Sequence, residues 1–258
     1  MLNAIRVERI TPPTQQEFES KYLRANRPVI ITGLVDNWPA LSKWNMLYFG
    51  SNFGETKAGV VKLKDGECDL NNFTGSRLDY VSIGETITAI SAGKINDGLA
   101  VASPLEVFPV SIQRDYSTPS FCTKGKFLRS RVFLGPKGTI TSLHQDLFEN
   151  LYTMVKGKKT ITLFEPSAPV YPNSRFSRLP NHAQVDPLKP DYNRFPDFKN
   201  AQPYIVELSA GETLFLPSFW WHHLKNEEES IAVSFWWAHG WKLPIAWAAA
   251  MYKKLRKI

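Results

Sequence analysis

Thr141-Ser142-Leu143-His144-Gln145-Asp146 is the stretch that decides the fold of this chain, together with the later run Trp220-Trp221-His222-His223. Residues two apart on a β-strand point to the same side, so His144 and Asp146 can reach one metal ion together. A histidine from the later run would complete a set of two imidazoles and one carboxylate. Such a set leaves three coordination positions open, which suits non-haem Fe(II) with a cosubstrate and O2.

The residues from 129 onward form short β-rich runs bounded by glycine, proline and asparagine. Several short strands at close spacing indicate a sandwich or a barrel. The predicted strands are 130–135, 139–144, 151–156, 159–164, 204–208, 213–216 and 231–237. Apolar spacing in the N-terminal half predicts helices over 14–25, 41–53 and 82–92 and strands over 29–32 and 60–64.

The proline-rich segment 165–203 has little periodicity and is too long for a plain connection, and such loops are usually functional. It offers donors and stacking faces suited to an extended substrate, on Tyr171, Arg175, Arg178, His182 and Tyr192. The alternative is a structural wrap over the strands. We hold both interpretations open at this stage.

Five blocks of the chain, in order, resemble the JmjC-type cupin hydroxylases, the family that includes factor inhibiting hypoxia-inducible factor. The blocks are RPVIITG at 27–33 with NWPA at 37–40, TSLHQD at 141–146, ENL at 149–151 with KGKK at 156–159, GETLFLP at 211–217 before the Trp-Trp-His-His run, and VSFWW at 233–237. The resemblance implies a mainly β fold with flanking helices, a double-stranded β-helix or jelly-roll. It implies one domain over 1–258: a support region (1–128), a jelly-roll core (129–240) and a C-terminal helix (241–258).

The same resemblance implies that the enzyme binds Fe(II) through His144, Asp146 and His222, which are its catalytic residues. The family's third ligand is the first histidine after the aromatic pair, which matches His222. His223 then faces away, because neighbours on a strand point to opposite sides. In the family, 2-oxoglutarate is the cosubstrate and O2 the oxidant. Oxidative decarboxylation yields succinate and CO2, and a hydroxyl group is transferred to an unactivated carbon.

Lys159 is the most informative residue after the histidines. On a strand it shares one face with Ile161 and Leu163, while Lys158 and its alternate neighbours share the other face. A buried ammonium is costly unless it is paired. A dicarboxylate cosubstrate would pair it, and in the family this position binds the distal carboxylate of 2-oxoglutarate. The alternative is an internal salt bridge to an aspartate or glutamate.

Further cosubstrate-pocket positions follow from the resemblance alone. Thr141 and Asn150 match positions that hydrogen-bond 2-oxoglutarate, and Trp236 matches one that walls the pocket. Tyr152 and Leu224 match flanking positions that could equally be plain core, and Ser234 stands where a relative has asparagine. One departure is Ala100, at the position where the family often has a tyrosine. Either Ser103 or Tyr152 replaces that hydroxyl, or cosubstrate binding is weaker, or the local alignment is shifted.

The composition is that of an ordinary globular protein of 258 residues, with 43% apolar and 21% charged residues. The net charge of +7 is spread along the chain and favours general surface charge over a nucleic-acid patch. Two cysteines cannot form a disulfide framework. No stretch approaches the roughly 20 apolar residues that span a bilayer. We therefore expect a cytoplasmic protein with no membrane association.

Three functions remain open. A hydroxylase of a protein or peptide side chain is favoured, a tRNA-base hydroxylase is the second, and a non-catalytic metal-binding cupin is the third. The C-terminal residues 241–258 predict a basic amphipathic helix with an apolar stripe that includes Trp247, Met251 and Tyr252. This apolar stripe either forms a homodimer contact or packs on the chain's own N-terminal helices, and we favour the homodimer slightly.

Overall fold

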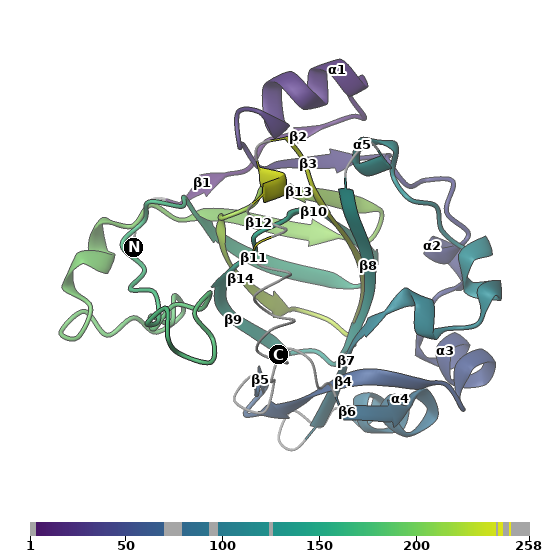
Figure 1. Cartoon of the computed structure of the whole chain (residues 1–258). Helices are drawn as coiled ribbons and strands as arrows, with labels where there is room; N and C mark the ends of the chain where they lie inside the picture. The colour runs from purple at the N-terminus through teal and green to yellow at the C-terminus, as the bar shows by residue number, and fades with distance from the viewer. Residues whose placement is uncertain are drawn as a thin grey trace.

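Strands make up most of the regular structure in the computed structural model, which describes residues 4–69, 79–92, 98–123, 126–240, 242–244 and 248 (Figure 1). The strands are β1 (Ile5–Arg6), β2 (Arg9–Ile10), β3 (Val29–Thr32), β4 (Lys57–Lys64), β5 (Glu67–Cys68), β6 (Asp79–Ser82), β7 (Gly98–Pro104), β8 (Lys126–Gly135), β9 (Ile140–Gln145), β10 (Glu149–Lys156), β11 (Lys158–Phe164), β12 (Tyr204–Ser209), β13 (Glu212–Leu216), β14 (Trp221–Asn226) and β15 (Ser230–Ala238). The α-helices are α1 (Gln15–Phe18), α2 (Ala40–Lys43), α3 (Met46–Phe53), α4 (Ile83–Ser91) and α5 (Ser120–Thr123). Helical turns of other types cover Glu19–Leu23, Leu105–Val107, Val110–Arg114 and Pro196–Asn200.

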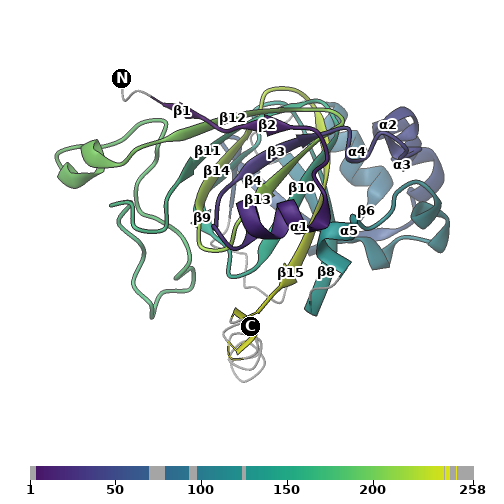
Figure 2. The same ribbon diagram turned by 90° about the horizontal axis from the view of Figure 1, so that it is seen from above.

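Two antiparallel groups of strands face each other and confirm the predicted jelly-roll. The smaller group has the order β12-β11-β14-β9, and the larger one has the order β8-β15-β10-β13-β3. They are joined through β5, β4 and β7, so the strands wrap around one interior (Figure 1). At the two ends of this path, β1 pairs in parallel with β12, and β2 pairs in parallel with β3. The N-terminal strands thus cover both sheet edges, as seen from above in Figure 2.

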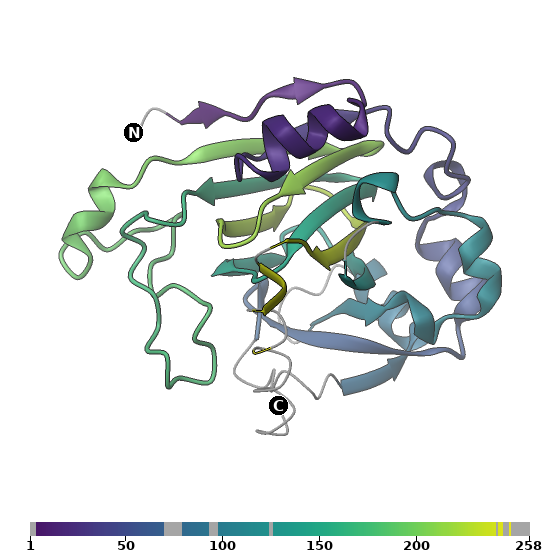
Figure 3. The same cartoon turned by 45° about the horizontal axis from the view of Figure 1, so that its top comes forward.

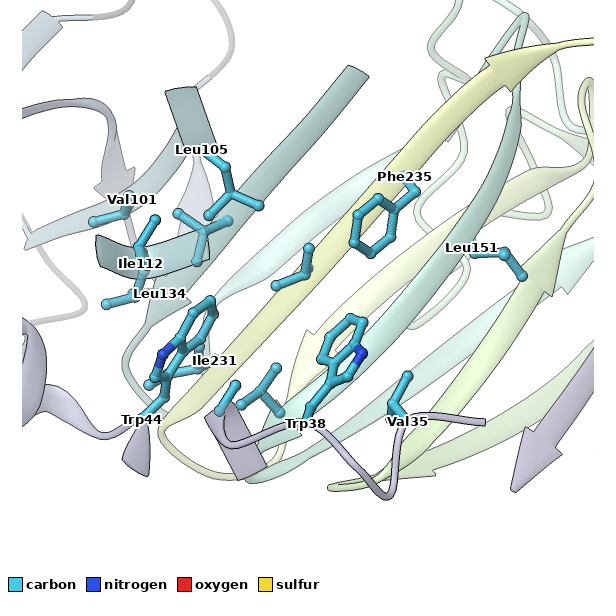
Figure 4. Packing of buried hydrophobic residues seen from close by; sticks show 14 of the residues in the cluster. Val35, Trp38, Trp44, Val101, Leu105, Ile112, Leu134, Leu151, Ile231 and Phe235 are labelled. Atoms are coloured by element: carbon cyan, nitrogen blue, oxygen red, sulfur yellow. The ribbon is translucent and has the colours of Figure 1, made fainter. Parts of the chain in front are cut away.

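The outer face of the larger group carries the main hydrophobic core. Figure 4 shows Trp38 and Trp44 packed close to Phe235 and Ile231 of β15. Helices α2, α3 and α4 lie on this side of the molecule, and α1 lies over the sheet in Figure 3. Burying aromatic and aliphatic side chains on one face leaves the other face of the same strands for the interior.

Two smaller hydrophobic clusters lie elsewhere in the fold. The interior between the two groups holds Tyr152, Met154, Ile161 and Leu163. The outer face of the smaller group is covered by the proline-rich segment 165–203, whose Val170, Val185, Phe195 and Phe198 pack with Leu143, Phe164 and Trp221. Trp221, which directly precedes His222, therefore belongs to this outer cluster and not to the interior.

The local structure corrects two other predictions. The helix predicted over 41–53 is divided, because Trp44 has an extended backbone and Asn45 caps α3 through the amide of Tyr48 at 2.8 Å. Strand β14 was absent from the predicted strands, because the sequence Trp-His-His-Leu-Lys-Asn has no polar–apolar alternation. The alternation is missing because the first three residues of β14 are buried on both faces of the strand.

The predicted C-terminal stripe falls almost wholly outside the described residues, and so does the predicted dimer contact. Within the described part, Lys242 donates to Glu149 Oε1 at 2.5 Å and to Asn26 Oδ1 at 3.1 Å. This contact fixes the start of the C-terminal segment to β10 and to the turn before β3. In the described ranges, no helix is long and apolar enough to cross a membrane.

Candidate metal centre and cosubstrate pocket

His144, Asp146 and His222 converge in the interior although they come from two strands far apart in the sequence. Their potential ligand atoms all lie within 4.8 Å of one another. His144 and His222 face each other across the β9–β14 pair, with ring centroids 4.0 Å apart. Asp146 follows directly after β9, and its Oδ2 lies 3.8 Å from His222 Nε2. The arrangement can hold one metal ion with two nitrogens and one oxygen.

A β-bulge sets which residues of β9 face the interior. His222 pairs with His144 and Leu224 pairs with Thr141, so one residue of β14 opposes two residues of β9 between these pairs. His222 and Leu224 share one face of β14, and their partners therefore share it too. Thr141 and His144 are three positions apart, so regular alternation would place them on opposite faces of β9. The bulge brings them to the same face.

Hydrogen bonds fix the orientation of both imidazoles. His144 Nδ1 lies 2.8 Å from the carbonyl oxygen of Ser142, and His222 Nδ1 lies 2.9 Å from that of Trp220. Because a carbonyl oxygen only accepts, Nδ1 carries the proton in each ring and Nε2 keeps its lone pair for a metal. Burial lowers the pKa of His222, with a further contribution from His144, so this imidazole is neutral.

Trp236 has a role that the sequence did not show. Its Nε1 donates a hydrogen bond of 3.0 Å to Asp146 Oδ2. Trp236 lies on β15 opposite Asn150 of β10, and Phe133 packs against its ring at 6.0 Å. The expected pocket wall therefore also orients the carboxylate of the metal site.

His223 lies on the opposite face of β14 from His222, as predicted. Only 3% of it is exposed, and burial lowers its pKa to about 4. It pairs in register with Thr162 of β11. Thr162 is also buried, so the face of β11 that carries Lys158 is partly covered.

Lys159 lies in the interior with the triad, as its predicted strand register requires. It pairs with Asn226 of β14, and Ile161 and Leu163 of the same strand pair with Leu224 and His222. Its Nζ donates to Asn226 Oδ1 and lies 6.0 Å from the centre of the Tyr152 ring. Among the described residues no ion pair includes Lys159, so the alternative of an internal salt bridge finds no support there.

Burial lowers the pKa of Lys159 to about 8, which measures how poorly the interior solvates its charge. Two other polar atoms, Asn150 Oδ1 and Ser234 Oγ, are buried and have no hydrogen-bond partner among the described residues. Asn150 and Ser234 lie on the adjacent strands β10 and β15, with Tyr152 opposite Ser234. Each unsatisfied group costs about 1–3 kcal/mol unless a polar ligand or water pairs with it. The ammonium of Lys159 and the hydroxyl of Ser234 can both donate, so they fit an anionic, oxygen-rich ligand such as 2-oxoglutarate, whereas Asn150 Oδ1 requires a donor such as water.

Cys68 is a neighbour of Thr141 that the sequence did not indicate. Its Sγ lies 4.0 Å from Thr141 Oγ1, and burial raises its thiol pKa to about 11. Ala100, on β7, provides no hydroxyl at the position of the family tyrosine. Ser103 accepts a hydrogen bond of 3.1 Å from the amide of Gly59 and is fully buried, so it is already used to hold β4.

His182 is brought to the metal centre by the proline-rich segment. Its ring stacks on that of His144, with centroids 5.2 Å apart and an interplanar angle of 16°. Burial lowers its pKa to about 3, with further contributions from His144 and His222. The sequence placed His182 in the segment 165–203, whose role as a substrate-binding loop or a structural wrap stayed open, and gave no signal that its ring contacts His144.

A jelly-roll with two histidines and an aspartate converging in its interior has the architecture of a cupin. A family model described as a cupin-like domain matches residues 15–242. The chain is 31% identical over 234 residues to "Lysine-specific demethylase 8" of Xenopus tropicalis, with 88% of this chain and 51% of that protein covered. It is 29% identical over 258 residues to the human "Bifunctional peptidase and (3S)-lysyl hydroxylase JMJD7", with 88% and 82% covered. It is 29% identical over 244 residues to "Lysine-specific demethylase JMJ30" of Arabidopsis thaliana, with 92% and 56% covered.

The chain belongs to the cupin-like domain family, and the relatives that it matches include proteins named for a JmjC domain. It spans about half the length of the demethylases it matches, and most of the length of the lysyl hydroxylase.

Proposed function

We propose that this protein is an Fe(II)- and 2-oxoglutarate-dependent hydroxylase that acts on a side chain of a protein or peptide. One observation carries the proposal: Lys159 is buried, has no carboxylate partner in the described ranges, and shares an interior with a potential metal triad. A non-catalytic cupin could retain the triad for structural reasons. It would gain nothing from also burying the charge of Lys159, because an unpaired buried ammonium is destabilising.

The residues have separate roles in this proposal. His144, Asp146 and His222 would hold Fe(II), with Trp236 orienting the carboxylate. Bound Fe(II) with 2-oxoglutarate supplies the oxidation of an unactivated C–H bond by O2, yielding succinate and CO2. Lys159 would pair with the distal carboxylate of the cosubstrate, which holds its other end at the metal site. The remaining pocket contacts are assigned to Thr141, Asn150, Tyr152, Leu224 and Ser234.

A protein substrate is supported by the comparisons. The relatives' names describe lysine-specific demethylases and a (3S)-lysyl hydroxylase, and both descriptions refer to lysine side chains of proteins. We propose hydroxylation, the reaction that the name of the lysyl hydroxylase describes, rather than demethylation. We place the protein in the cytoplasm on its composition.

Succinate release tests the proposal. The protein is incubated with Fe(II), 2-oxoglutarate and ascorbate, first with a peptide library and then with total tRNA. Peptide-stimulated succinate, with a mass increase of one oxygen on a peptide, supports the proposal. Stimulation by tRNA alone would favour the tRNA-base hydroxylase. No succinate in any incubation would favour a non-catalytic cupin.

A further inference from the structure

His182 is a third histidine at the metal centre, and neither the metal triad nor the cosubstrate pocket uses it. It comes from the segment 165–203, and only 9% of it is exposed. Its backbone forms an antiparallel bridge with that of His144, and the two rings are nearly parallel. A packing residue at this position would need no nitrogen atoms, because an aromatic ring alone would cover His144.

Backbone hydrogen bonds hold this part of the segment against β9. The amide of Ala183 donates to Leu143 O at 2.8 Å, and the amide of Gln145 donates to Asn181 O at 2.9 Å. The amide of Asn173 donates to His182 O at 2.8 Å from the other side. Residues 181–183 thus lie along the strand that carries His144, and the His182 ring has a fixed place beside the triad.

The hydrogen-bond chain determines where the His182 ring carries its proton. Asn181 Nδ2 donates to the carbonyl oxygen of Gln145 at 3.1 Å. This bond fixes the orientation of the Asn181 side-chain amide, whose oxygen Oδ1 therefore points away from that carbonyl. Oδ1 lies 3.2 Å from His182 Nδ1. An amide oxygen only accepts, so Nδ1 carries the proton and Nε2 is an acceptor. In the described part of the chain Nε2 has no hydrogen-bond partner, and it is not one of the fully buried polar atoms, so water or a ligand can reach it.

We propose that His182 is a specificity-determining residue whose Nε2 accepts a hydrogen bond from a nitrogen-bearing substrate side chain, such as lysine, at the metal centre. The inference rests on the proposed function and names the chemistry of its substrate. A site that offers a hydrogen-bond acceptor rejects an analogue without the donor, because the acceptor is then left unpaired. The ring stack on His144 keeps this acceptor in register with the metal.

Two substitutions separate the acceptor from the ring. His182→Phe keeps an aromatic ring on His144 and removes the nitrogens, whereas His182→Ala removes both. The probes are two peptide libraries, randomised except for one central residue, which is lysine in one and norleucine in the other. Norleucine keeps the aliphatic chain of lysine and lacks its ammonium group. Succinate release with Fe(II) and 2-oxoglutarate gives the preference, and equilibrium titrations give the binding of metal and cosubstrate.

We expect the unsubstituted protein to prefer the lysine library. His182→Phe lowers this preference by roughly tenfold or more, as expected for one hydrogen bond to a charged group, while Fe(II) and 2-oxoglutarate bind as before. His182→Ala lowers the preference equally and also weakens Fe(II) binding. The proposal is overturned if His182→Phe keeps the lysine preference, or if both variants differ from the unsubstituted protein only in Fe(II) binding.

A second measurement does not depend on turnover. Long-range 15N–1H spectra of the Zn(II)-loaded protein with 2-oxoglutarate distinguish the two imidazole tautomers. Protonation of His182 on Nδ1 supports the acceptor, and protonation on Nε2 overturns the proposal while leaving the proposed function intact. If no peptide stimulates the unsubstituted protein, the proposed function fails, and the inference about its substrate fails with it.

Discussion

Neighbouring residues of β15 point to opposite faces of the strand and meet different surroundings there. Phe235 points outward and packs between Trp38 at 6.0 Å and Tyr116 at 6.1 Å, in a core of matched apolar surfaces. Ser234 and Trp236 point inward, where one hydroxyl has no partner and one indole donates to Asp146. The outer face is complete within the chain itself. The inner face has polar groups that a ligand must satisfy, so an unsatisfied interior marks the functional side of the strand.

Removing a triad residue should have the largest effect. His144→Ala or Asp146→Ala should abolish turnover and lower iron occupancy, because two remaining ligands hold the ion poorly. The melting temperature should change little, since the triad is not part of the apolar clusters. Metal analysis and thermal unfolding measure the two quantities. Full turnover in either variant would rule out the triad.

Phe235→Ala should show the reverse pattern. Truncating a fully buried phenylalanine typically lowers the free energy of unfolding by about 3–5 kcal/mol. The folded fraction should still bind Fe(II) with unchanged stoichiometry, because Phe235 faces away from the triad. Denaturant unfolding followed by metal titration tests this. A loss of metal binding without loss of stability would show that the two faces are not separate.

Lys159→Ala should weaken 2-oxoglutarate binding by roughly 10- to 150-fold, since a charge-assisted contact is worth about 1.5–3 kcal/mol. Lys158→Ala is the matched control on the opposite face of β11, where Lys158 pairs with Glu207 at 3.3 Å. Calorimetric titration of both variants tests the strand register. Equal effects would mean that the register does not determine which lysine meets the cosubstrate.

The pH dependence follows from the pKa of Lys159, which burial lowers from 10.5 to about 8. Above pH 8 the ammonium loses its proton, so 2-oxoglutarate affinity should fall by up to about tenfold per pH unit. In the unfolded chain Lys159 keeps this proton until about pH 10.5, so between pH 8 and 10.5 the unfolded state binds more protons than the folded state. The free energy of unfolding without cosubstrate should therefore rise with pH in that window. Lys159→Met should remove both trends.

Trp236→Phe should have the smallest effect. The ring remains and only the hydrogen bond to Asp146 is lost, so Fe(II) affinity should fall about tenfold. Metal titration measures this, and thermal unfolding serves as the control for packing. An unchanged affinity would show that Asp146 is held by other contacts.

The sequence predicted the fold class and most strands of the core, because alternation and turn residues are local signals. It placed Lys159 correctly for the same reason, since strand register needs only the neighbouring residues. It missed the bulge that brings Thr141 beside His144, and it missed the contacts of Cys68, Trp236 and His182. Each of these depends on a partner at least 36 positions away or on the other side of a strand pair. It also missed β14, whose burial on both faces removes the alternation that identifies a strand.

The most direct test of the account is an anaerobic titration of the protein with Mn(II) and then with 2-oxoglutarate, in the unsubstituted protein and in Asp146→Ala. Mn(II) replaces Fe(II) without turnover, so the titration measures binding alone. We predict one equivalent of metal and one of 2-oxoglutarate in the unsubstituted protein, with cosubstrate binding strongly reduced in Asp146→Ala. Absence of 2-oxoglutarate binding, or equal binding in both proteins, would contradict the account.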